Sequence, residues 1–137
     1  MTQKINVSAT VHASTDSVWD CYTNPEHITQ WNFADPSWHC PSATNDMQIG
    51  GKYTARMEAK DGSFGFDLEA IYSELDLKKH FTYIMPNGRE VKVVFTNDNG
   101  ATEVNITFDG DGENAIDMQK AGWQAILNNF KTYVEAL

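Results

Sequence analysis

Residues 114–137, NAIDMQKAGWQAILNNFKTYVEAL, form the stretch of sequence that decides the fold. The apolar residues recur at spacings of three, four and seven, which places them on one stripe of an α-helix; they are Met118, Trp123, Ile126, Leu127, Phe130, Tyr133, Val134 and Leu137. Asn114 is the predicted N-cap, and Asp117 places negative charge in the first turn. Gly122 costs about 1 kcal/mol relative to alanine in a helix interior, so we expect a reason for it, such as close approach of backbone or ligand.

The residues before this helix are expected to supply the apolar surface on which it packs. Six segments alternate between apolar and polar residues, as half-buried strands do; they are 4–12, 50–58, 64–72, 81–85, 91–95 and 104–108. Two short helices follow the first strand, one capped by Ser14 and one started by Asn24 and Pro25. This order predicts an α+β fold in which a six-stranded antiparallel sheet curves around the long C-terminal helix.

Residues 32–47, NFADPSWHCPSATNDM, are predicted to be a long loop, because they contain Pro36 and Pro41 and show no clear period. Ordered loops of this length are often lids or binding segments. Phe33 and Trp38 are costly to leave in water, so they either cover the core or line the rim of a pocket.

Composition limits the partners of the chain. Its 137 residues fit one domain, 1–137. The net charge of −9 repels nucleic-acid phosphates and anionic lipid head groups, so we expect neither nucleic acid nor membrane as a partner. Because the sequence has no apolar stretch of about 18 residues and no signal-peptide core, a cytoplasmic location is expected.

Few residues are arranged for chemistry. The spacing of the four histidines matches no metal motif, so neither a metal nor a cofactor is expected; they are His12, His27, His39 and His80. Cys21 and Cys40 are expected to be free thiols. A Cys-His nucleophilic site remains conceivable through folding, although nothing in the sequence names its base or orienting acid.

Asp67 and Glu69 share one face of a predicted strand, as a general acid and base would. The alternation places this face in solvent, with Arg56 and Lys92 available across the strands. Surface ion pairing is therefore the preferred interpretation.

Three motifs in this order resemble the activator of heat-shock-protein ATPase homologue family: ASTDSVWDCYTNPEHITQW (13–31), IGGKY (49–53) and AGWQAILNNFKTYVE (121–135). That family lies within the helix-grip superfamily, which includes START-related lipid-transfer domains, pollen-allergen-like proteins and polyketide cyclases. The resemblance covers essentially the whole chain, and each motif is weak alone. It is more specific for fold than for function, since one fold hosts many tasks.

The resemblance implies a cavity between the long helix and the concave sheet. Mapped by the predicted facing of each residue, the candidate lining of this ligand cavity is Trp19, Tyr22, Trp31, Tyr53, Met57, Phe66, Leu68, Phe81, Tyr83, Met85, Val93, Phe95, Phe108, Met118, Gly122, Trp123, Ile126 and Phe130. Ordinary core packing is the alternative role for each of them.

Three functions follow as alternatives. The first is a non-catalytic protein that binds a small apolar or amphipathic ligand, as a monomer or a homodimer. The second is a cochaperone-like module that stimulates a chaperone ATPase, although the cochaperone that names the family carries an additional N-terminal domain for engaging the chaperone. The third is a cyclase, dehydratase or hydrolase, for which Tyr22, Tyr53 and Tyr83 are the best inward polar groups.

Overall fold

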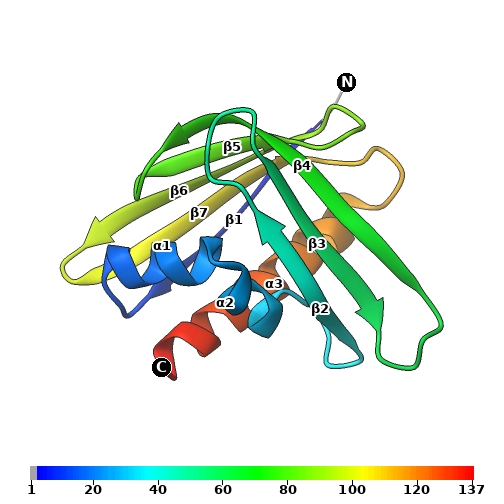
Figure 1. The fold of residues 1–137 in the computed structure, drawn as a ribbon, viewed down its shortest axis with the longest axis horizontal. Helices are drawn as coiled ribbons and strands as arrows, with labels where there is room; N and C mark the ends of the chain where they lie inside the picture. Colours follow the sequence, from blue (N-terminus) through cyan, green and yellow to red (C-terminus); the bar gives the residue numbers. More distant parts are fainter. Residues whose placement is uncertain (1–2) are drawn as a thin grey trace.

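Seven antiparallel strands curl around one long helix in the computed structural model of the chain, which describes residues 3–137 (Figure 1). The elements are β1 (Lys4–Val11), α1 (Thr15–Thr23), α2 (Pro25–Trp31), β2 (Trp38–Asn45), β3 (Lys52–Ala59), β4 (Gly65–Asp76), β5 (His80–Ile84), β6 (Glu90–Asp98), β7 (Ala101–Asp109) and α3 (Ile116–Glu135). The strand order is β1-β7-β6-β5-β4-β3-β2, so β1 and β2 are the edges. The predicted α+β helix-grip fold is confirmed, with one more strand than the six expected.

The additional strand is β2, which lies within the stretch predicted to be a loop. Proline lacks a backbone N–H and interrupts a strand pattern, but an edge strand or a bulge tolerates it. Pro41 occupies such a position, because β2 is an edge strand and its register with β3 shifts between His39 and Ser42. The loop prediction is therefore wrong for Trp38–Asn45.

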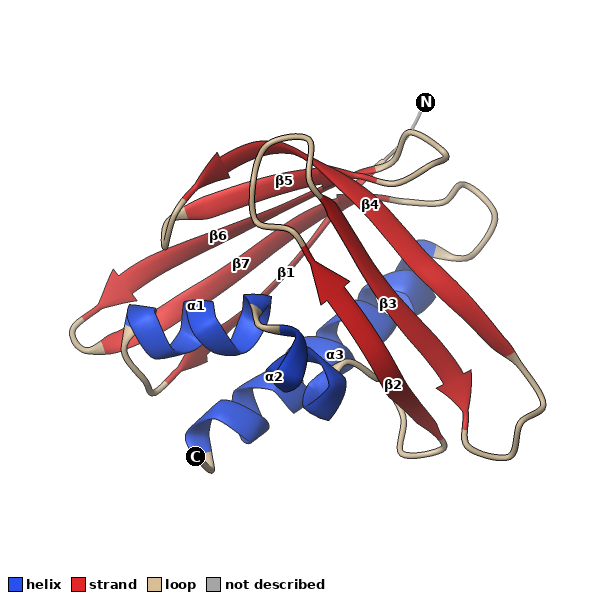
Figure 2. Cartoon of the chain, in the orientation of Figure 1, coloured by secondary structure: helices blue, strands red, loops and turns tan. Residues whose placement is uncertain are grey.

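The two short helices begin at the predicted caps. The Ser14 hydroxyl accepts a hydrogen bond from the Ser17 amide at 3.3 Å. The Asn24 side chain accepts one from the Glu26 amide at 3.0 Å, with Pro25 at the start of α2. Figure 2 shows α1 and α2 beside the C-terminal part of α3, and both helices contact it. These contacts close one end of the space enclosed by the curled sheet.

The long helix starts later than its predicted cap. Ala115 is the N-cap residue and makes no side-chain capping bond, so the assignment of Asn114 as the cap is wrong. The Asn114 side chain donates instead to Asp111 at 2.7 Å. The Asp111 carboxylate also accepts from the amides of Glu113 and Asn114, and these bonds lower its pKa to about 2. A turn held together by the Asp111 carboxylate therefore precedes α3.

The core lies between α3 and the concave face of the sheet. Leu127, Phe130 and Val134 are the buried residues of α3, which packs against β1. The Phe130 ring lies 4.9 Å from that of Trp31 and 5.1 Å from that of Tyr22, centroid to centroid. Packed aromatic rings therefore fill the space under the C-terminal half of α3. No helix among residues 3–137 is long and apolar enough to span a membrane.

Gly122 has no close neighbour, contrary to expectation. A Cβ atom built on Gly122 meets nothing within 4 Å. Gly122→Ala should therefore raise the free energy of unfolding in urea by about 1 kcal/mol, the difference in helix propensity. Gly51→Ala is the contrast, because its Cβ would clash with the Asp46 carbonyl oxygen. A Gly122→Ala protein less stable than the wild type would contradict this account.

Candidate functional site

A pocket of about 310 Å³ lies between residues 119–127 of α3 and the concave face of the sheet. This volume is near the lower end of the range of small-molecule sites. The pocket is lined by Tyr22, Trp31, Asn32, Tyr53, Met57, Phe66, Leu68, Tyr72, Phe81, Tyr83, Met85, Arg89, Ile106, Asp111, Gln119, Trp123, Ile126 and Leu127. Aromatic and aliphatic side chains thus form most of the wall.

Most residues proposed from the sequence as cavity lining meet at this pocket. They come from α1, α2, the strands β3 to β5, the turn after β5, and α3. They are Tyr22, Trp31, Tyr53, Met57, Phe66, Leu68, Phe81, Tyr83, Met85, Trp123 and Ile126.

The other proposed residues lie outside the pocket lining. Trp19, Val93, Phe95 and Phe130 are buried core residues. Phe108 is covered by Trp123, whose ring stacks on it with centroids 4.1 Å apart. Two positions on α3 also differ from expectation: Met118 is 67% exposed, and Gly122 faces open space. Inward facing therefore identifies core residues as well as pocket residues.

Several lining residues were not proposed from the sequence; they are Asn32, Tyr72, Arg89, Ile106, Asp111, Gln119 and Leu127. Asn32, Arg89 and Asp111 lie outside the helices and strands, where periodicity assigns no facing. A signal did exist for Gln119, which precedes Trp123 by four residues and so shares its helix face.

Two of the pocket tyrosines are tied to asparagine side chains. The Asn32 amide donates to the Tyr53 hydroxyl at 3.3 Å, and the Tyr72 hydroxyl donates to the Asn45 side chain at 2.7 Å. These bonds hold both rings in the wall. They also satisfy polar groups that would otherwise be costly to bury.

The other two pocket tyrosines have uncommitted hydroxyls. Neither Tyr22 nor Tyr83 has a hydrogen-bond partner for its hydroxyl within residues 3–137. Burial, the largest cause, raises the pKa of both hydroxyls, so both remain protonated at neutral pH. The pocket therefore offers two free hydroxyl donors within an aromatic wall.

Charged and amide groups complete the pocket lining near the start of α3. The Arg89 Nε donates to the Asp109 carbonyl oxygen at 3.0 Å. The Gln119 side chain accepts from the Asp111 amide at 2.9 Å, which ties α3 to the preceding turn. With a pKa of about 2, Asp111 is a weak base at neutral pH and is poorly suited to proton transfer.

The β3–β4 hairpin projects away from α1 (Figure 2). Phe64 and Phe66 of this hairpin form an aromatic cluster with Trp38. Trp38, Phe64 and Phe66 contact one another, with ring centroids 5.9 to 6.2 Å apart. Phe66 lines the pocket and is nevertheless 44% exposed. Trp38 thus joins the pocket rim through Phe66, one of the two roles considered for it from the sequence.

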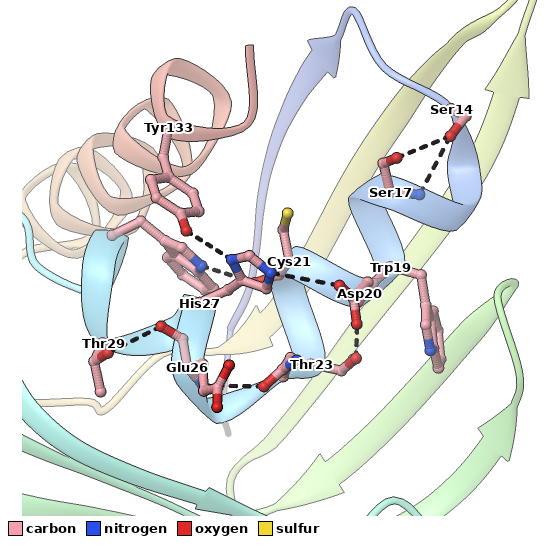
Figure 3. Close-up of polar contacts among 12 residues, drawn as sticks. Ser14, Ser17, Trp19, Asp20, Cys21, Thr23, Glu26, His27, Thr29 and Tyr133 are labelled. Atoms are coloured by element: carbon pink, nitrogen blue, oxygen red, sulfur yellow. Dashed lines mark hydrogen bonds and ion pairs between the residues drawn. The ribbon is translucent and has the colours of Figure 1, made fainter. Parts of the chain in front are cut away.

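A second polar cluster joins the three helices (Figure 3). His27 lies between Tyr133, whose hydroxyl is 2.6 Å from Nδ1, and Asp20, whose carboxylate is 3.4 Å from Nε2. The sulfur of the neighbouring Cys21 has no hydrogen-bond partner within the described chain, and burial raises the pKa of its thiol. This cluster ties α1, α2 and α3 together, but the Cys21 thiol is not activated.

The remaining polar candidates are surface or core groups. His39 lies 3.7 Å from Glu58, whereas the adjacent Cys40 is buried and its pKa is raised by burial. No group of three or more His, Cys, Asp or Glu side chains suited to a metal occurs among residues 3–137.

Asp67 and Glu69 form surface ion pairs. Asp67 lies 3.3 Å from Arg56, as expected from the sequence. Glu69 lies 3.6 Å from Lys52, whereas Lys92 had been expected as a cation across the strands. Exposed pairs of this kind contribute little to stability.

Comparison with known proteins assigns the chain to a family. The model of the family described as activator of Hsp90 ATPase homolog 1-like protein matches residues 12–135. The chain is similar to the solution structure of an AHSA1-like protein from Aeromonas hydrophila, at 38% identity and a TM-score of 0.92, covering 98% of this chain and 93% of that one. A protein of known structure from Cytophaga hutchinsonii is 41% identical, with a TM-score of 0.84 and coverage of 97% and 92%.

More distant structures share the fold alone. A protein from Chromobacterium violaceum is 16% identical, with a TM-score of 0.86 and coverage of 97% and 98%. No curated protein matches the sequence significantly. Because the family match spans nearly all of the described residues, the chain belongs to the activator of Hsp90 ATPase homolog 1-like family.

Proposed function

We propose that the protein binds a small, mostly apolar molecule in the pocket between α3 and the sheet. The observation that carries this proposal is the unfilled volume of about 310 Å³ behind an aromatic wall. Most of this wall is aromatic or aliphatic, so covering it with an apolar group in place of water is favourable. Family membership and fold are compatible with this role.

The size of the pocket bounds the expected affinity. Its volume is about ten times the ~30 Å³ that one water occupies in the liquid. A ligand of about ten heavy atoms, at about 0.5 to 0.8 kcal/mol per atom, would bind with a free energy of about −5 to −8 kcal/mol. The corresponding dissociation constants lie between about 200 µM and 1 µM.

Filling the pocket tests the proposal. 1-Naphthylamine, a neutral and mostly apolar dye of about the size that the pocket admits, should bind the wild type with enhanced fluorescence and raise its Tm. Leu68→Trp places a larger side chain in the pocket wall and should weaken dye binding at least about tenfold, because the dye and the indole compete for one space.

Ile71→Trp provides the matched control for this substitution. Ile71 lies on the same strand, is 45% exposed and does not line the pocket. This variant should bind the dye like the wild type. Equal binding by the Leu68→Trp and Ile71→Trp proteins, or no binding by the wild type, would refute the proposed function.

Family membership favours a second candidate, stimulation of a chaperone ATPase. Its test is the ATP turnover of Hsp90 with and without the chain. Leu68→Trp provides a discriminating variant, because a surface-mediated effect would survive the filling of the pocket.

A further inference from the structure

Arg89 is a pocket cation without an ion-pair partner. Within residues 3–137 no carboxylate oxygen lies within 4.0 Å of its guanidinium, whereas Arg56 pairs with both Glu58 and Asp67. The bond from Nε to the Asp109 carbonyl fixes the side chain and leaves both Nη atoms without a hydrogen-bond partner in the same part of the chain. A guanidinium held in this way presents two free donors to a planar anion.

Tyr83 supplies a further donor from the adjacent strand. The residue is only 6% exposed and lines the pocket, and its hydroxyl has no partner within residues 3–137. Tyr83 pairs with Val91 across β5 and β6, two residues from Arg89. Tyr83 and Arg89 line the same pocket, so an acceptor bound there can receive hydrogen bonds from the hydroxyl and from the guanidinium.

Two nearby carboxylates, Asp109 and Asp111, are already bound to other groups. The Asp109 Oδ1 atom forms an ion pair with the Lys4 ammonium at 2.5 Å, and Oδ2 accepts a hydrogen bond from the Glu90 amide at 2.9 Å. Asp111 also lines the pocket, but its oxygens already accept from the amides of Glu113 and Asn114 and from the Asn114 side chain.

We propose that the ligand is an amphiphile whose carboxylate head is bound by Arg89 and Tyr83 and whose apolar chain lies against the aromatic wall. This inference rests on the proposed function and adds the chemical class of the ligand. The chain carries a net charge of −9, which repels anions at long range. Recognition of a carboxylate therefore depends on the local donors, with the long-range field screened over about 8 Å at physiological salt.

The test compares decanoate with decanol, which has the same chain and a neutral head, by calorimetry at physiological ionic strength. The wild type should bind decanoate at least about tenfold more tightly than decanol, the range expected for charge-assisted hydrogen bonds. Arg89→Met should reduce this ratio to about one, mainly by weakening decanoate binding. Tyr83→Phe should lower the ratio about threefold.

Lys92→Met is the matched control, because it removes one positive charge from an exposed position on β6. It should leave the ratio unchanged. Arg89→Lys, which keeps the charge, should retain part of the preference and guards against a folding defect in Arg89→Met. Unfolding curves verify that each variant is folded.

The outcomes separate the two proposals. Binding of both probes by the wild type with equal affinity, or loss of the preference in Lys92→Met as well, would overturn the carboxylate assignment while leaving the pocket function intact. If the wild type bound neither these probes nor the naphthylamine dye, the proposed function itself would fail.

Discussion

Phe130→Ala is expected to lower the free energy of unfolding by about 3–5 kcal/mol, because it removes a fully buried ring from the contact between α3 and the short helices. The ring packs edge-on against Trp31 and Tyr22, so its loss leaves a cavity that rigid aromatic neighbours fill poorly. A domain of this size is stable by about 5–15 kcal/mol. The variant should therefore fold but melt about 10–20 °C below the wild type.

Urea unfolding followed by tryptophan fluorescence and by circular dichroism measures this loss. Met118→Ala is the control on the same helix, since Met118 is mostly exposed and its truncation should change stability by no more than about 0.5 kcal/mol. Similar losses in the two variants would contradict the packing of α3 described above.

Local signals in the sequence were sufficient for most of the fold. The helical spacing in 114–137 predicted α3 and the buried residues Leu127, Phe130 and Val134, although the ends of the predicted stripe, Met118 and Leu137, are exposed. The caps Ser14 and Asn24 predicted where α1 and α2 begin. The strand β2 was missed because Pro41 reads as a strand breaker unless the strand is known to lie at an edge. Edge position is a property of the whole sheet, so the local sequence does not contain it.

The sequence predicted which side of each strand faces α3, but not where along α3 the pocket lies. Alternation identifies the concave side of a strand, and Tyr53 and Tyr83, assigned to that side, line the pocket. It does not say where along the helix the core is filled, so Phe130 under the C-terminal half of α3 was grouped with Trp123 under the N-terminal half. Arg89 was missed because it follows a turn, where the path of the chain determines the facing of a side chain.

The four pocket tyrosines lead to the second large effect, a loss of stability in alkaline solution. Burial is the first cause of the raised pKa of Tyr22, Tyr53, Tyr72 and Tyr83. In the unfolded chain these hydroxyls ionise near pH 10. As the pH rises above that value, the unfolded state loses protons that the folded state retains, so unfolding becomes more favourable.

Each such tyrosine lowers the free energy of unfolding by about 1.4 kcal/mol for every pH unit between its pKa in the unfolded chain and its pKa in the folded chain. With four of them, the free energy of unfolding should fall by about 5 kcal/mol by pH 11, and the stability should be fully present below about pH 9. Urea unfolding at a series of pH values measures the slope. The tyrosinate absorbance of the four pocket residues, as distinct from that of Tyr133 outside the pocket, should rise only as the protein unfolds.

Tyr83→Phe isolates one group from this slope. Between pH 9 and pH 11 the free energy of unfolding of this variant should fall by about 1.4 kcal/mol less than that of the wild type, because phenylalanine has no proton to release. Met85→Leu, a nearby change in the pocket wall without a titratable group, should keep the full slope. A wild-type stability that stays level up to pH 11 would mean that water already reaches these hydroxyls. The same result would count against the apolar surroundings of these tyrosines, on which binding of an apolar chain depends.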